Sequence, residues 1–312
     1  MLAPGQILMV GDQTMDFTVA WLLGWLVDSH LPADAATQGV IALYAALFVT
    51  GLCALCGIGL YLLPRGHYWP PKAEQLRHRP WRVGDVALIV ATLVLLQAIA
   101  LTAMLVLRRW GRFAVVDSQQ AWIIIHSIAL HWSALACVGW AIHLKRVSWA
   151  HAFGAFQRRP WWIRVGQACC IYAATMPLLM VLTIAYQWWL EATGYTPTPQ
   201  DVVLLFSELE RGWMYAYFIF LAIVLAPVSE ELLFRGILLP ALAKRFGLCA
   251  AILVQTALFA LLHLHIPSLI PLLVLSVTLS LAYLYTASIF VPIIMHMIFN
   301  AISLLAMVLL AA

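Results

Sequence analysis

Two adjacent carboxylates and an arginine stand within one strongly apolar stretch of the chain, as Glu230, Glu231 and Arg235. Ionisable groups near the centre of a bilayer cost about 2.5–3.5 kcal/mol each on insertion scales, so they occur there in pairs or with a function. Glu231 and Arg235 are four residues apart on one helix face, which predicts a structural ion pair. Glu230 is turned about 100° away and has no counter-charge on its own helix, so we expect it to act as a general base.

Two further apolar stretches carry histidines. His263 ends the first of them, and the second contains His296 with Asn300 four residues later on the same face. A glutamate and a histidine can polarise a water that lies between them, and a second histidine and an amide can donate hydrogen bonds to a developing oxyanion. Together with Glu230, these groups are typical of a site that hydrolyses acyl bonds.

A structural role is the alternative for each of these polar groups. A single histidine or glutamine within an apolar helix is more often an interhelical hydrogen-bond partner than a catalyst, and we expect that role for Gln97, His126 and His131. A buried ion pair would account for Glu231 with Arg235. It would leave Glu230 unexplained, so the site hypothesis is favoured.

The composition excludes a water-soluble protein. Hydrophobic residues make up 64% of the 312 residues and charged residues 10%, whereas soluble domains have about 45–50% and about 25%. Most of the surface must therefore face lipid. The formal net charge of +4 is small and spread over connections, so we expect no nucleic-acid partner. The six cysteines all fall in apolar runs, which predicts no disulfide framework.

The apolar runs predict an all-α fold, a polytopic transmembrane helical bundle of about eight helices. A helix needs about 20 apolar residues to cross the hydrocarbon core. The predicted spans are residues 39–63, 85–107, 121–144, 162–188, 214–239, 248–263, 267–285 and 288–310. The sixth and seventh are short, and we expect them to form a hairpin that does not span fully. A shorter apolar stretch at 17–27 predicts an interfacial helix.

The basic residues between the spans predict the orientation. Lys and Arg concentrate in the connections after the first, third and fifth spans, and such connections are cytoplasmic. These residues are Arg65, Lys72, Arg77, Arg79, Arg82, Lys145, Arg146, Arg158, Arg159, Lys244 and Arg245. We therefore expect both termini outside the cytoplasm and a site that opens to the cytoplasmic side of a membrane, most simply the bacterial inner membrane.

The helical rise then predicts the depth of the site residues. At 1.5 Å per residue, Glu230 lies about 14 Å and His296 about 12 Å from the cytoplasmic ends of their helices. His263 lies about 22 Å from the start of its own helix. Pro267 and Pro271 follow His263 closely. We expect a broken hairpin there, which sets the His263 ring deeper than the other groups or shifts it back.

The three motifs together resemble a known family. Glu230 to Gly236 has the pattern EExxxR followed by glycine, residues 259–263 have FxxxH, and residues 296–300 have HxxxN, each on its own apolar helix. This order resembles the CPBP (CAAX protease and bacteriocin-processing, or Abi) family of intramembrane endopeptidases. The family includes the type II CAAX prenyl endopeptidases and lysostaphin-resistance-like proteins. The resemblance covers about residues 214–310.

The resemblance implies an intramembrane endopeptidase that hydrolyses peptide bonds of membrane-associated substrates, of CaaX type or of leader or bacteriocin type. By this likeness Glu230 and His263 activate the water, while His296 and Asn300 form the oxyanion site. The expected partners are a peptide or protein substrate in or at the membrane and the lipid bilayer. The chain then divides into residues 1–38 with the interfacial helix, variable membrane helices over 39–213, and a catalytic membrane core over 214–312.

Metal dependence and two other functions stay open on the sequence. Glu230, His263 and His296 could hold zinc, because two histidines, a glutamate and a water form a familiar catalytic set. The HExxH spacing is absent, so we favour glutamate-activated water without a metal. The first alternative function is a non-proteolytic family member that binds or chaperones membrane proteins. The second is a proton-coupled transporter, which should show inverted repeats that the sequence lacks.

Overall fold

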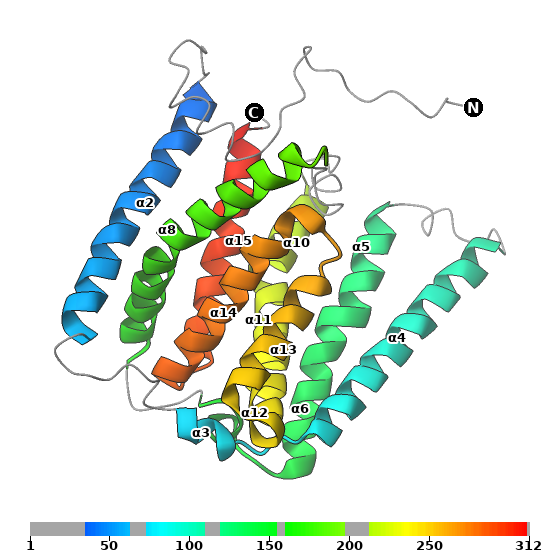
Figure 1. Ribbon diagram of the computed structural model, residues 1–312. Helices are drawn as coiled ribbons and strands as arrows, with labels where there is room; N and C mark the ends of the chain where they lie inside the picture. Colours follow the sequence, from blue (N-terminus) through cyan, green and yellow to red (C-terminus); the bar gives the residue numbers. More distant parts are fainter. Residues whose placement is uncertain (1–34, 63–72, 110–118, 155–159, 197–211, 311–312) are drawn as a thin grey trace.

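The computed structural model describes residues 35–62, 73–109, 119–154, 160–196 and 212–310, and the described residues form a bundle of helices (Figure 1). Within these ranges no strand occurs, so the predicted all-α fold is confirmed. Seven described helical stretches are long and apolar enough to cross a membrane. The interfacial helix predicted at 17–27 lies outside the described residues. All six cysteines are free.

The first four spans come from long apolar runs whose backbone groups are satisfied within each helix, as lipid demands. The third of these spans is divided by a π-helical stretch, η3. The elements are α2 (Ala35–Leu62), α4 (Val83–Arg109), α5 (Gln119–Ser127), η3 (Ile128–Trp132), α6 (Ser133–Lys145) and α8 (Trp161–Ala192).

The fifth span is one long helical stretch with two π-helical interruptions. Its parts are α10 (Trp213–Phe220), η4 (Leu221–Leu225), α11 (Ala226–Glu231), η5 (Leu232–Leu238) and α12 (Leu239–Phe246). Pro227 is the second residue of α11, which begins directly after η4. A proline has no N–H to donate, so the carbonyl bonding of the preceding turn must change. Such π-helical stretches frequently occur at functional sites.

The last part of the chain forms a hairpin and a final span. Its elements are α13 (Leu248–Leu261), η6 (Ile266–Ser268), α14 (Leu269–Thr286) and α15 (Phe290–Leu310). With 14 residues, α13 is about 21 Å long, short of the about 30 Å hydrocarbon core. It packs against α14, as expected for a hairpin. The expectation that the seventh segment is also short is wrong, because Ile266–Thr286 is long enough to span.

The described basic connections gather at one end of the bundle. The short helix α3 (Ala73–Arg77) lies beside α12 at this end, while α2 begins and α15 ends at the other (Figure 1). A second short helix, α7 (Trp149–Phe153), packs against η5. The Arg79 guanidinium donates to the carbonyls of Ala150 and His151 at 3.2 and 3.0 Å. Lys244 donates to the carbonyls of Arg79 and Trp81. Cations thus satisfy backbone carbonyls in the connection before α4 and in the short helix α7.

The two halves of the chain share an apolar core. Side chains of α8 such as Tyr172 and Met176 are buried against Leu275 and Leu279 of α14. At Gly51 of α2 an added Cβ would lie 2.4 Å from the carbonyl oxygen of Ala173 in α8, so only glycine permits this close approach. α2 is thus packed on α8, and α8 packs against α14 and α15, which carry residues of the site.

Candidate active site

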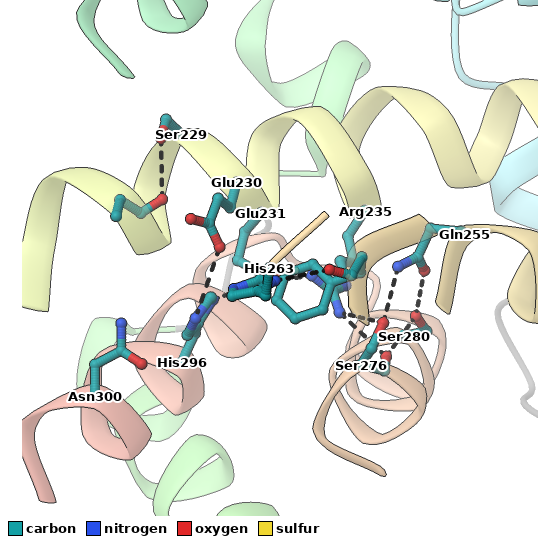
Figure 2. A network of polar contacts seen from close by, with 12 residues as sticks. Ser229, Glu230, Glu231, Arg235, Gln255, His263, Ser276, Ser280, His296 and Asn300 are labelled. Atoms are coloured by element: carbon teal, nitrogen blue, oxygen red, sulfur yellow. Dashed lines mark hydrogen bonds and ion pairs between the residues drawn. The ribbon is translucent and has the colours of Figure 1, made fainter. Parts of the chain in front are cut away.

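Glu231 and Arg235 form a fully buried ion pair inside the fifth span. The distance from Arg235 Nη1 to Glu231 Oε1 is 2.7 Å, and neither side chain is exposed. The other end of the guanidinium reaches α14, where Nη2 donates to Ser276 Oγ at 2.8 Å and to the Ser276 carbonyl at 3.2 Å. A buried charge needs both a counter-charge and hydrogen-bond partners, and Arg235 has both here (Figure 2).

A chain of small polar side chains extends this network between α13 and α14. Gln255 Nε2 donates to Ser276 Oγ at 3.0 Å, and Ser280 donates to Gln255 Oε1 at 2.7 Å. All three side chains are fully buried. None of the three motifs contains these residues, so they were not predicted as part of the site. Their signal in the sequence was the pair of serines four residues apart in the apolar stretch 269–286, facing the one glutamine of 248–261.

His296 links the ion pair to Glu230. Its Nδ1 lies 2.9 Å from Glu231 Oε1, and because an ionised carboxylate only accepts, Nδ1 carries the hydrogen and donates it. Its Nε2 then lies 3.9 Å from Glu230 Oε2. The Glu230 side chain is 23% exposed and that of His296 is 4% exposed. The structure therefore brings Glu230 and His296 together at the edge of a buried network (Figure 2).

His263 lies two residues after the end of α13 and is exposed, whereas His296 is buried. Its Nδ1 is 2.8 Å from the carbonyl oxygen of Phe259, one turn earlier, so the ring is folded back along its own helix. The Phe259 ring stands 5.0 Å from the His263 ring and 5.8 Å from the His296 ring, between centroids. In the described part of the chain no hydrogen bond or ion pair joins His263 to Glu230.

Asn300 is oriented by a carbonyl that the fifth span leaves free. In η4 the N–H of Ala226 bonds to the carbonyl of Leu221, five residues back. The next donor in this register, for the carbonyl of Ala222, would be residue 227, which is proline. Asn300 Nδ2 donates to that carbonyl at 2.8 Å instead. An amide nitrogen carries two hydrogens, so the second one can serve another acceptor.

The predicted zinc ligands do not form one cluster. Among the residues that the structure describes, no three His, Cys, Asp or Glu side chains lie close enough together to hold a metal ion, so Glu230, His263 and His296 are not gathered for that purpose. Glutamate-activated water without a metal, which the sequence favours, stays a prediction. Chelation of divalent cations should then leave the activity unchanged, and loss of activity on chelation would contradict it.

Comparison with known proteins matches the region that carries the site to one protein family. The family model described as type II CAAX prenyl endopeptidase, Rce1-like, matches residues 212–302. This range contains all three motifs, and the resemblance inferred from them is confirmed. No curated protein and no solved structure matches the chain.

Proposed function

We propose that this chain, whose residues 212–302 match the Rce1-like type II CAAX prenyl endopeptidase family, is an intramembrane endopeptidase that hydrolyses peptide bonds of membrane-associated substrates. The observation that carries the proposal is the approach of Glu230 to His296. The two side chains come from different helices of the matched region and meet at 3.9 Å beside a buried ion pair.

The separation suits one water between the two groups. A distance of 3.9 Å is too long for a direct hydrogen bond, whereas one water can bond to both Glu230 Oε2 and His296 Nε2 at about 2.8 Å each. In this mechanism the water oxygen bonds to the carbonyl carbon of the substrate while its proton passes to Glu230. The C–N bond then breaks as the leaving amine takes up this proton from Glu230, directly or by way of His263, and the carboxylate is restored. This assignment puts His296, rather than His263, next to the attacking water.

His263 and Asn300 are assigned to the substrate. With Nδ1–H donated to the Phe259 carbonyl, the neutral His263 ring keeps a lone pair on Nε2, which can receive a proton and return it to the leaving amine. Asn300 uses one N–H on the Ala222 carbonyl, and its second N–H can donate to the oxyanion of the tetrahedral intermediate. Both groups reach the site from helices other than that of Glu230.

We assign CaaX-type peptides with a prenylated cysteine as the substrate class, on the strength of the family match. Leader or bacteriocin-type peptides are the other outcome of the test. The experiment compares, by mass spectrometry, the membrane and secreted peptides of cells that make the wild-type protein or Glu230→Ala at equal levels. Glu74→Ala is the matched control, because it removes an exposed carboxylate that lies outside the matched residues 212–302.

Peptides that lose their C-terminal residues only with the wild type and with Glu74→Ala would support a CaaX-type protease. Peptides that lose a leader in the same pattern would correct the substrate class. Identical peptide sets for the wild type and Glu230→Ala would contradict the peptidase function. A binding or chaperone function should survive Glu230→Ala, so it predicts this last result.

A further inference from the structure

His131 is a half-buried histidine that the proposed mechanism does not use. It lies in η3, the π-helical stretch of the third span, outside the matched residues 212–302. The sequence predicted an interhelical hydrogen bond for it, and the structure confirms one, since His131 Nδ1 is 2.7 Å from Ser229 Oγ. Its partner is the residue that directly precedes Glu230.

The hydrogens of this contact can be assigned. Ser229 is buried, with 2% of its surface exposed, and its Oγ is also 3.0 Å from the carbonyl oxygen of Ala226. A carbonyl only accepts, so the single hydroxyl hydrogen of Ser229 goes to Ala226. Both contacts can therefore be made together only if Nδ1–H of His131 donates to Ser229. The result is a series of two hydrogen bonds that runs from His131 in the third span, through Ser229, to the backbone of α11.

The segment held in this way needs an external anchor. α11 has six residues, lies between the π-helical stretches η4 and η5, and has Pro227 near its start. Its own backbone bonding is therefore less regular than that of an uninterrupted helix. η3 packs against α11 at this place. Ser229 and Glu230 leave the helix in different directions, with Glu230 turned toward His296 (Figure 2).

We propose that His131 is a positioning residue of the active site: it anchors α11 at Ser229 and thereby holds the Glu230 carboxylate beside His296. The inference rests on the proposed function, in which Glu230 is the base. It gives the first half of the chain a part in the chemistry of the second. The side chain acts through its Nδ1–H donor. The site therefore requires an N–H donor at this place rather than an imidazole as such.

The test measures kcat and KM of the full-length protein in nanodiscs on a fluorogenic peptide that ends in an S-farnesylated CaaX sequence. His131→Leu and Ser229→Ala each remove one end of the hydrogen bond, and kcat should fall by about tenfold while KM stays within about twofold. His131→Asn puts an amide N–H near the position of Nδ1 and should restore kcat to within about threefold of the wild type. The double variant should be no slower than either single variant, because both remove the same contact.

His126→Leu is the matched control, since His126 lies on the preceding turns of the same span and is exposed; it should behave as the wild type. If His131→Leu folds poorly, as judged by size exclusion, Ser229→Ala decides, because it deletes only a hydroxyl. Wild-type kcat in Ser229→Ala, or equal losses in His131→Asn and His131→Leu, would overturn the positioning role alone. No cleavage by the wild type, or full cleavage by Glu230→Ala, would overturn the proposed function and this inference with it.

Discussion

Glu231 accepts two hydrogen bonds at a single carboxylate oxygen, one from Arg235 and one from His296. The same buried charge therefore balances the arginine and fixes which nitrogen of His296 carries the hydrogen. His296 Nε2 is left to face Glu230. At the scale of the residue, the ion pair and the Glu230–His296 pair proposed to be reactive belong to one network, so a change to the first should reach the second.

Arg235→Ala should lower the free energy of unfolding by about 3–5 kcal/mol, because it leaves Glu231 as an unpaired charge in a fully buried position. Folded yield and thermal unfolding in detergent measure this. Arg77→Ala is the matched control, since Arg77 faces Glu74 in an exposed pair at 4.0 Å and should cost less than about 1 kcal/mol. If Arg235→Ala were as stable as Arg77→Ala, the structural role of the pair would be refuted.

At the scale of the element, the fifth span combines a regular helix with two π-helical stretches that adjust it to its neighbours. η4 leaves the Ala222 carbonyl for Asn300, and η5 carries Arg235 toward Ser276. α13 is too short to cross the membrane alone and ends where His263 folds back over Phe259. The site is thus formed where the fifth span departs from regular helical geometry and where α13 ends, next to the regular helix α15.

Gly51→Ala should separate α2 from α8 and destabilise the protein by about 1–3 kcal/mol, because the new Cβ meets a backbone oxygen that cannot turn aside. Thermal unfolding measures the change. Gly57→Ala on the same helix meets nothing within 4 Å and should be neutral or slightly stabilising. Equal stability of the two variants would show that the close approach of α2 and α8 does not contribute.

The helices and the ion pair could be predicted from the sequence because both depend on spacing along one helix. Apolar runs of span length gave the helices, and the four-residue spacing of Glu231 and Arg235 gave the pair. The contacts of Gln255 with Ser276 and of His131 with Ser229 join helices that are distant in the sequence. No spacing encodes them. The π-helical stretches also escaped prediction, since only packing decides which carbonyl a helix leaves free.

At the scale of the whole molecule, the described basic connections lie at one end of the bundle, as their alternation along the chain predicted (Figure 1). Lys145 pairs with Asp85 at 2.8 Å at this end, so part of the positive charge is balanced locally. The net excess of Lys and Arg still favours the cytoplasmic side for this end. The depths predicted for Glu230 and His296 are then distances from this cytoplasmic end of the bundle.

The topology predicts that a cysteine at Arg77 is protected from a membrane-impermeant thiol reagent in intact cells, whereas a cysteine at Thr193 is labelled. Both positions are exposed in the structure, so a difference in labelling reports their side of the membrane. The variants are made in a background without the six native cysteines. Labelling at position 77 from outside intact cells would contradict the orientation, and labelling at both positions after permeabilisation is the control.

The rate of peptide cleavage by Glu230→Gln tests the central claim most directly. Glutamine keeps the size and polarity of the side chain but cannot take a proton from water, so the account predicts a kcat about 10²–10⁴-fold below that of the wild type on the S-farnesylated CaaX peptide. Thermal unfolding should be unchanged, since Glu230 is partly exposed and has no part in the ion pair. A folded Glu230→Gln protein that cleaves the peptide at the wild-type rate would contradict the account.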